Sequence, residues 1–182
     1  LNLPDVIKVS GKGSIFYNYD AAGVKLRKRV VDSTTLPAKI TTTLYVGNAV
    51  YVNDTLQFFA TGEGRARVST GNDGWIYDYF LKDHLGNTRM VITDDYNVAS
   101  PILEVSSYYP FGLQQKGIGL LQEAKPLHNK YTYNGKELLE DLGLDQYDYG
   151  ARFYDAQIRR FSTIDPMEEV SRKWSPYGYS YN

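Results

Sequence analysis

The sequence lacks cysteine altogether, and this absence removes several kinds of chemistry. Without a thiol the protein can form no disulfide, hold no zinc through thiolates and use no cysteine nucleophile. The sequence also lacks any apolar run near the roughly 20 residues that cross a bilayer, so we expect no membrane span. Its net charge of −1 gives no general attraction to nucleic acid, so we expect no nucleic-acid partner.

The signatures of common catalytic and cofactor sites are also missing. The two histidines, His84 and His128, have no partners at metal-ligand spacing. The glycines at 11–13 and 62–64 are not followed by the start of a helix, as a nucleotide-binding loop would be. No serine lies in a Gly-x-Ser-x-Gly elbow. We therefore expect neither a metal nor a cofactor.

Tyrosine, in contrast, is abundant, with 17 in 182 residues. Most of these tyrosines occur in Tyr-x-Tyr pairs. The pairs are Tyr17/Tyr19, Tyr77/Tyr79, Tyr131/Tyr133, Tyr147/Tyr149 and Tyr177/Tyr179/Tyr181. A spacing of two residues puts both rings on one face of a β-strand, whereas on a helix they would point in different directions. The pairs therefore predict strands with an aromatic face.

Strand-like segments alternate with turn formers along most of the sequence. Gly47-Asn48 and Asn53-Asp54 are typical of tight hairpin turns. The expected strands are 14–19, 24–31, 40–45, 49–52, 55–60, 75–81, 88–93, 102–109 and, with an interruption at Gly150, 146–153. Short strands at even intervals predict an all-β fold of antiparallel hairpins. In the strand at 24–31 we expect Lys25, Arg27, Lys28 and Arg29 to face mostly solvent, with Val24 and Leu26 on the other side.

Three segments depart from this pattern. Residues 136–144 have leucines at helical spacing and Gly143 at the position of a helix C-cap, although Asn134-Gly135 also fits a hairpin turn. Residues 167–173 follow Pro166 and predict one helical turn. Residues 111–130 have a weak pattern and are expected to be a connection. A short helical or irregular insertion is thus expected in the C-terminal part.

Seven short motifs follow one another along the sequence, and their number and order are more specific than any one of them. They are 16–23 (FYNYDAAG), 79–89 (YFLKDHLGNTR), 108–112 (YYPFG), 131–137 (YTYNGKE), 143–155 (GLDQYDYGARFYD), 160–166 (RFSTIDP) and 174–177 (WSPY). Together they resemble the Rhs, or YD-repeat, family, with the Rhs-associated core from residue 131 on. The WSPY variant and the acidic residues after Pro166 are similar to the form found in Bacteroidetes.

The resemblance implies a long β-sheet that spirals into a hollow shell around a C-terminal toxin or effector polypeptide. It implies three parts, namely YD-repeat hairpins at 1–112, a connection at 113–130 and a truncated Rhs-associated core at 131–182. The implied partners are the protein's own C-terminal effector segment or the remaining YD repeats, and secretion machinery. The implied location is secreted or on the cell surface. Both ends of the sequence look like the middle of a longer polypeptide.

The resemblance also implies candidate catalytic residues. In shell-forming toxins of this family the core carries an aspartyl autoprotease with an Arg-Phe and an Asp-Pro element, which here would be Arg160-Phe161 and Asp165-Pro166. Such a protease needs two carboxylates that share a proton, and the second would lie downstream of Asn182. Arg159 and Ala156 depart from the family's glycine and proline. A turn or cap carboxylate is the structural alternative for Asp165.

We therefore expect a non-enzymatic segment of a shell or scaffold. A self-cleaving aspartyl protease core in the full-length protein is one alternative. A surface adhesion or carbohydrate-binding module is the other, because aromatic faces can stack on sugars as well as on neighbouring strands.

Overall fold

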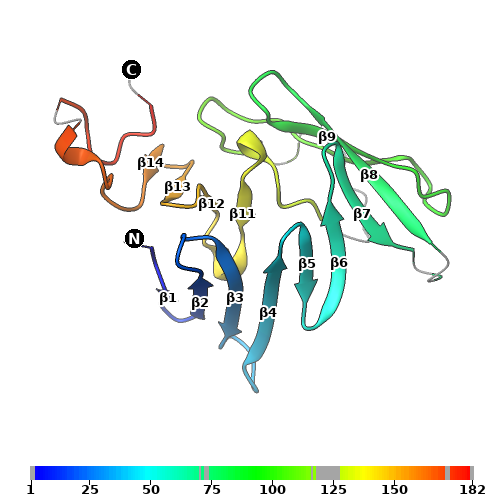
Figure 1. Ribbon diagram of the computed structural model, residues 1–182, viewed down its shortest axis with the longest axis horizontal. Helices are drawn as coiled ribbons and strands as arrows, with labels where there is room; N and C mark the ends of the chain where they lie inside the picture. The colour runs from blue at the N-terminus through cyan, green and yellow to red at the C-terminus, as the bar shows by residue number, and fades with distance from the viewer. Residues whose placement is uncertain are drawn as a thin grey trace.

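The computed structural model describes residues 3–69, 71, 74–115, 117, 128–170 and 173–180, and their regular structure consists of β-strands and short 3-10 turns (Figure 1). Ten strands form one antiparallel sheet in the order of the sequence, and four strands form a second antiparallel sheet. The predicted all-β architecture of antiparallel hairpins is confirmed. Within the described ranges, no helix has the length and apolar character needed to cross a membrane.

The strands of the large sheet are β1 (Val6–Val9), β2 (Gly13–Tyr19), β3 (Lys25–Asp32), β4 (Lys39–Val46), β5 (Ala49–Val52), β6 (Thr55–Ala60), β7 (Gly64–Val68), β8 (Trp75–Lys82), β9 (Thr88–Thr93) and β10 (Ile102–Val105). The small sheet contains β11 (Glu137–Leu139), β12 (Gln146–Asp148), β13 (Phe153–Asp155) and β14 (Arg160–Phe161). The 3-10 turns are η1 (Tyr133–Gly135), η2 (Asp141–Gly143) and η3 (Glu168–Val170).

Tight turns set the register of the large sheet. Gly47-Asn48 joins β4 to β5, so that Val46 pairs with Ala49. Asn53 and Asp54 both have positive φ, 47° and 63°, as a two-residue turn that follows the twist of its strands requires. These two hairpins form where the sequence predicted them. Strands β1 and β7 were not predicted.

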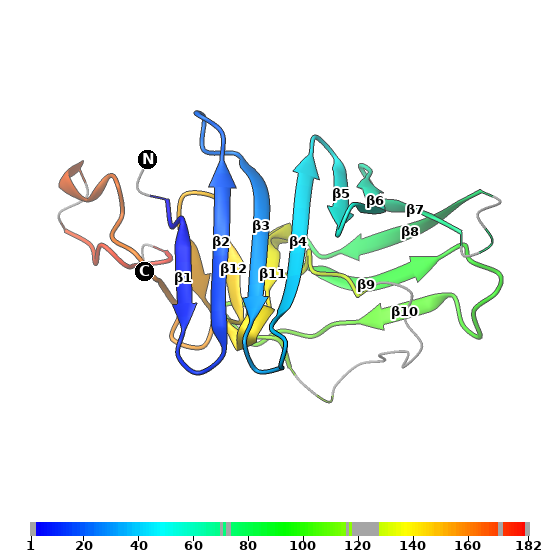
Figure 2. The same ribbon diagram turned by 90° about the horizontal axis from the view of Figure 1, so that it is seen from below.

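The large sheet is strongly twisted and curls around the small one. In Figure 2, β8, β9 and β10 run nearly across the direction of β2, β3 and β4, as the accumulated twist of a long sheet produces. Figure 1 shows β11 and β12 inside the curve of the large sheet. The small sheet therefore packs as a second layer on the inner side of the curved large sheet.

Both faces of the small sheet are buried, in two separate clusters. Leu139 and Phe153 pack with Ile15, Tyr17 and Val30 of the large sheet. Leu138 and Tyr154, which are adjacent to them in the sequence, belong to an aromatic cluster on the opposite face. This aromatic cluster consists of Tyr133, Leu138, Tyr147, Tyr154, Ala156 and Phe161. Alternation of adjacent side chains between two cores is the two-residue period of a strand buried on both faces.

The helix predicted over 136–144 is therefore wrong. Leu138 and Leu139 lie on opposite faces of β11, whereas a helix would have placed Leu138, Leu139 and Leu142 on one side. After the strand, Leu142 and Gly143 have positive φ, 57° and 74°, which no right-handed helix contains. The turn predicted at 167–173 exists as η3, a single 3-10 turn at 168–170, and residues 171–172 lie outside the described part. Most of the connection at 111–130 also lies outside it.

Candidate functional site: the interface between the two sheets

Asp165, the predicted catalytic carboxylate, shapes the turn after β14. Its Oδ1 accepts a hydrogen bond from the N–H of Met167 at 2.9 Å, and its own N–H donates to the carbonyl of Pro176 at 2.9 Å. A carboxylate that accepts the N–H two residues ahead closes an Asx turn. Asp165 has the contacts of a turn carboxylate, the structural alternative raised for it.

The arginine beside Asp165 is Arg152, which the sequence did not indicate. Its Nη2 lies 2.8 Å from Oδ2 of Asp165, and its guanidinium lies over the ring of Phe161, 3.8 Å from the ring centroid. Arg160, the predicted partner, is exposed on β14 and lies opposite Asp155 of β13 in the backbone register. The catalytic roles of Asp165 and Arg160 stay predictions.

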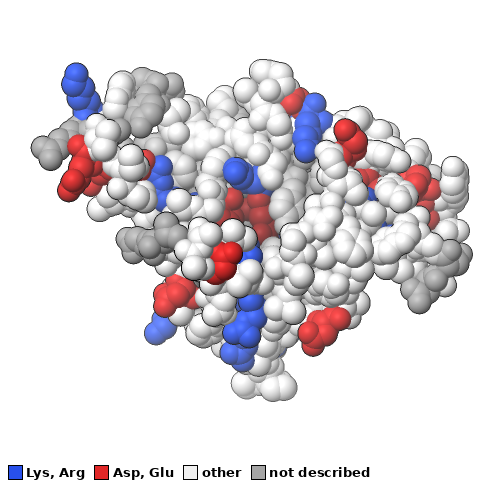
Figure 3. All heavy atoms as spheres, in the orientation of Figure 1, with Lys and Arg blue, Asp and Glu red and all other residues white. Residues whose placement is uncertain are grey.

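A buried network of ion pairs joins the large sheet to the small one. Nζ of Lys25 lies 2.6 Å from both Glu137 and Asp148, and Nζ of Lys28 lies 2.6 Å from Asp141 and 3.5 Å from Glu137. The hydroxyl of Tyr45 donates to Glu137 at 2.8 Å. Figure 3 shows basic and acidic side chains meeting in a hollow near the middle of the molecule. Both lysines come from β3, and the carboxylates come from 137–148.

These contacts correct the expectation that Lys25 and Lys28 face solvent. Lys28 is only 2% exposed, whereas Val24 and Leu26 are 58% and 44% exposed. A shift in register at Tyr19 changes the face that Lys25 occupies, and the carboxylates of the small sheet neutralise both cations. Arg27 and Arg29 are exposed as expected.

The charges within this network stabilise one another. Burial alone would raise the pKa of Glu137, but Lys25 and Lys28 and the hydrogen bond from Tyr45 outweigh it and hold that pKa below its ordinary value. Burial alone would lower the pKa of Lys25, but Glu137 and Asp148 outweigh burial and raise it. Burial and the nearby Glu137 raise the pKa of Tyr45. All three groups therefore keep their ordinary charge states at neutral pH.

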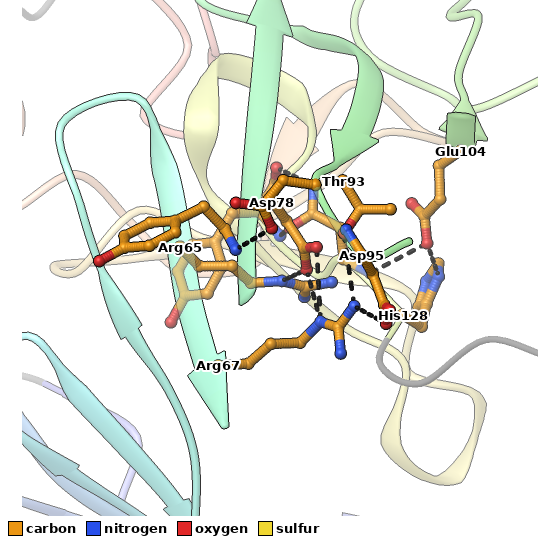
Figure 4. A network of polar contacts seen from close by, with 11 residues as sticks. Arg65, Arg67, Asp78, Thr93, Asp95, Glu104 and His128 are labelled. Atoms are coloured by element: carbon orange, nitrogen blue, oxygen red, sulfur yellow. Dashed lines mark hydrogen bonds and ion pairs between the residues drawn. The ribbon is translucent and has the colours of Figure 1, made fainter. Parts of the chain in front are cut away.

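A second buried network lies under β7 to β9, and Figure 4 shows it closely. The carboxylate of Asp78, whose side chain has no exposed area, accepts from Nε of Arg65 at 2.7 Å and from Nε of Arg67 at 3.1 Å. Arg67 also reaches Asp95 at 3.3 Å. Burial lowers the pKa of Arg65, and Asp78 opposes that shift. The arginines of β7 therefore belong to the interior.

His128 extends this region toward the small sheet. Its Nδ1 lies 2.9 Å from the buried carboxylate of Glu104, and its Nε2 lies 3.4 Å from Glu140. Hydrogen bonds to Glu104 and Glu140 raise the pKa of His128 to about 9, against the opposing effect of burial. The imidazole is therefore positively charged at neutral pH and ties the segment at 128–130 to β10.

Tyrosine hydroxyls fasten the aromatic cluster to its surroundings. Tyr147 and Tyr154 donate to the carbonyls of Gly112 and Phe111, at 3.0 and 2.8 Å. The ring of Tyr179 stacks on that of Tyr154 with 4.1 Å between centroids, and its hydroxyl donates to Asn134 at 2.7 Å. The turn after β10 and the C-terminal segment are thus held against the small sheet.

One tyrosine pair is not used for packing inside the molecule. Trp75, Tyr77 and Tyr79 lie on one face of β8, as predicted, and they are 48%, 43% and 45% exposed. The ring of Phe59 lies 5.4 Å from that of Trp75. This outer face is an exposed aromatic strip. Among all the residues that the structure describes, no three histidine, aspartate or glutamate side chains come together as metal ligands would.

Some of these buried charged residues have a signal in the sequence. Asp148 lies between Tyr147 and Tyr149, so on a strand it must face away from both rings, toward whatever covers the other side. Arg65 and Arg67 flank Ala66 with the same period. When the alternation of a strand places a charged side chain toward the interior, a buried partner of opposite charge is expected.

Comparisons with known proteins agree with the fold. No protein-family model matches the sequence. Salivary gland surface protein 1 of Aedes aegypti is 40% identical over 106 residues, which are 58% of this chain and 3% of that protein. A crystal structure of TcdB2-TccC3-TEV matches 88% of this chain, with 18% identity and a TM-score of 0.66. A Photorhabdus luminescens Tc holotoxin pore with a mutation in TccC3 matches the same share, with the same identity and TM-score.

The protein spans only 8% of the matched polypeptide in each of these two structures. At this identity the likeness concerns the fold alone. The protein therefore has the fold of a small segment of the TcdB2-TccC3 polypeptide.

Proposed function

We propose that this protein is a non-enzymatic segment of an Rhs-type shell, in which the large sheet forms part of the wall and the small sheet closes it from within. The observation that carries the proposal is the buried attachment between the sheets. Lys25 and Lys28 of β3 are neutralised by carboxylates of the small sheet, and Leu139 and Phe153 pack on β2 and β3. Such an attachment makes the two sheets one rigid unit.

The arrangement suits a scaffold better than a catalyst. Each strand of the large sheet pairs with the next in sequence, so a sheet of this kind can be extended hairpin by hairpin. The buried charges of the attachment are paired with one another, and they serve packing. The proposed division into repeats at 1–112, a connection at 113–130 and a core at 131–182 follows from the motifs named above.

The proposed cargo and location come from the comparisons and the motifs. One structural neighbour is described as a Tc holotoxin pore, and another is described as TcdB2-TccC3 without a hypervariable C-terminal region. The curated relative is described as a surface protein of the salivary gland. We place the intact protein outside the cell or on its surface, where the shell would enclose or present a C-terminal effector segment.

Limited proteolysis of the longer polypeptide that contains these 182 residues tests the proposal. The segment after the core should resist protease at concentrations that degrade the same segment when it is produced alone. Glu137→Gln, which weakens the attachment of the small sheet, should expose the segment. Equal digestion of the enclosed and the isolated segment would contradict the proposal.

The aspartyl autoprotease stays a separate prediction for the intact protein. Its test is a processed band on a denaturing gel, lost on Asp165→Asn. Arg152→Gln tests the positioning of Asp165, because Nη2 of Arg152 lies 2.8 Å from its carboxylate. This variant keeps the carboxylate and should weaken the processed band, whereas Asp165→Asn should abolish it. A band that persists unchanged in Asp165→Asn would rule out the protease.

The exposed strip on β8 supports a second candidate function, adhesion to a carbohydrate surface. Trp75 and Tyr77 are 48% and 43% exposed, and stacking of a sugar on an aromatic ring requires such exposure. Binding to immobilised polysaccharides by the wild type, lost in Trp75→Ala with Tyr77→Ala, would support adhesion. Lys82→Ala, at the exposed end of the same strand, is the matched control. No binding by the wild type would eliminate this candidate.

A further inference from the structure

The last segment that the structure describes in full, 175–180, lies along the outer edge of the small sheet. β14 is the final strand of that sheet. On its outer side Arg160 forms a β-bridge with Gly178, and the N–H of Phe161 donates to the carbonyl of Tyr177 at 3.0 Å. A segment added in this way supplies hydrogen-bond partners that an edge strand otherwise leaves to water. The segment is therefore docked on the edge of β14.

A tight turn gives the docked segment a defined shape. The N–H of Gly178 donates to the carbonyl of Ser175 at 2.9 Å, which closes a β-turn with Pro176 at its second position. Proline is favoured at this position because its ring holds φ near about −65°. A turn that is already formed loses little entropy when it docks.

Tyr179 is the side chain that anchors the segment. Its ring stacks on that of Tyr154 with 4.1 Å between centroids and lies edge-on to the ring of Tyr149 at 5.7 Å. Its hydroxyl donates to Oδ1 of Asn134 at 2.7 Å. The aromatic cluster and Asn134 thus form a pocket that takes both the ring and the hydroxyl of one tyrosine.

Most of the segment around this anchor is exposed. Ser175, Tyr177, Gly178 and Ser180 are exposed, whereas Tyr179 is partly buried against the aromatic cluster. One packed side chain and a few backbone hydrogen bonds therefore hold the segment, and so local an attachment opens more readily than the core of the fold. An anchor side chain in a pocket, with main-chain pairing along a sheet edge, is the contact pattern of a bound peptide.

The docked segment also contacts the turn that contains Asp165. The carbonyl of Pro176 accepts from the N–H of Asp165 at 2.9 Å and from Nη1 of Arg152 at 3.3 Å. Nη2 of Arg152 in turn lies 2.8 Å from the carboxylate of Asp165. Departure of the segment would remove the acceptor that these two groups share.

From these contacts we infer that the edge of β14 and the aromatic cluster form a docking site for a peptide in which a Pro-x-Gly turn is followed by tyrosine. The chain's own residues 175–180 occupy the site, and the same sequence supplied as a separate peptide can replace them. Occupation of the site holds the turn of Asp165 in place. The inference goes beyond the proposed shell and does not depend on it.

Amide hydrogen exchange followed by NMR tests the inference on the 182-residue protein. Tyr179→Ala should speed exchange of the Asp165 amide at least about tenfold, because the unanchored segment no longer keeps its acceptor in place. A hexapeptide with the sequence of residues 175–180, added at roughly millimolar concentration, should slow this exchange again. A segment on a short tether has an effective concentration of roughly this size, so the added peptide can replace it.

Two controls separate docking from a general loss of structure. Tyr96→Ala, at a turn tyrosine that is 98% exposed, should leave exchange of the Asp165 amide unchanged. A hexapeptide with alanine in place of the tyrosine that corresponds to Tyr179 should not restore slow exchange. Tyr179→Phe keeps the ring and loses the hydrogen bond to Asn134, so it should speed exchange roughly two- to tenfold, again reversed by the peptide. This variant carries the test if Tyr179→Ala does not fold.

Unchanged exchange at Asp165 in both Tyr179 variants would overturn the anchoring role of Tyr179 and with it the inference. Faster exchange that does not respond to the hexapeptide, or that responds equally to the alanine version, would overturn the docking site. The protease-protection test uses the longer polypeptide and reports on the enclosed segment. Failure of the docking site therefore leaves the proposed shell intact, and failure of the shell leaves the docking site intact.

Discussion

Glu137 is the residue whose loss should weaken the attachment between the two sheets most clearly. Its side chain is 9% exposed and lies 2.6 Å from Lys25, 3.5 Å from Lys28 and 2.8 Å from the hydroxyl of Tyr45. Glu137→Gln keeps the size of the side chain and removes its charge. Two buried cations then lose a shared partner.

The expected loss of stability follows from burial. Removing one partner of a buried ion pair costs about 3–5 kcal/mol, because the remaining charge stays desolvated. Lys25 keeps Asp148 and Lys28 keeps Asp141, both at 2.6 Å, so we expect the lower end of this range. A loss of about 3 kcal/mol corresponds to a fall in melting temperature of roughly 6–12 °C for a protein of this length.

Thermal and urea unfolding at pH 7, followed by circular dichroism, measure this loss. Glu63→Gln, at an exposed turn position before β7, is the control and should change stability by less than about 0.5 kcal/mol. The pKa of Glu137 is lowered, so its stabilisation is present above the ordinary value of 4.5 and is lost as the pH falls through the folded-state value. The difference between variant and wild type should therefore shrink in acid. A melting temperature like that of Glu63→Gln at pH 7 would refute the role assigned to the network.

Three further predictions use the same measurements. Gly112→Ala should destabilise the fold more than Gly11→Ala, since both glycines have positive φ but only at Gly112 would a Cβ collide with the ring of Tyr133; equal losses would contradict this. Asp78→Asn should cost about 3 kcal/mol or more because two buried arginines lose their common carboxylate; a loss below about 1 kcal/mol would be too small for a buried ion pair. The raised pKa of His128 stabilises the fold fully below pH 6.5, and this contribution should disappear as the pH rises through about 9; an unchanged pH dependence in His128→Gln would rule it out.

The local pattern of the sequence was sufficient to predict most of the large sheet. Gly47-Asn48 and Asn53-Asp54 have backbone preferences that leave few alternatives to a tight hairpin, and the strands beside them form as expected. Strand β7 was missed because its alternation places arginines inward. Burial of Arg65 and Arg67 depends on Asp78, which lies on the next strand and follows them in the sequence.

The small sheet was harder to predict because its contacts are long-range. Leu138 and Leu139 fit a helical stripe, whereas β11 buries one on each face. The charges on Lys25 and Lys28 indicated exposure, and only the carboxylates more than a hundred residues later explain their burial. Local periodicity predicts the face of the strand on which a side chain lies. Whether that face is buried depends on contacts with segments that are distant in the sequence.

A cryo-electron microscopy map of the longer polypeptide would decide whether these two sheets are wall and closure of a shell. We expect the large sheet to continue into neighbouring hairpins as the wall of a hollow shell. We also expect the small sheet to lie inside that wall, with Lys25 and Lys28 against Glu137, and density for the C-terminal segment to be enclosed. A large sheet that ends at β1 and β10, with the C-terminal segment outside in solvent, would contradict the proposed shell.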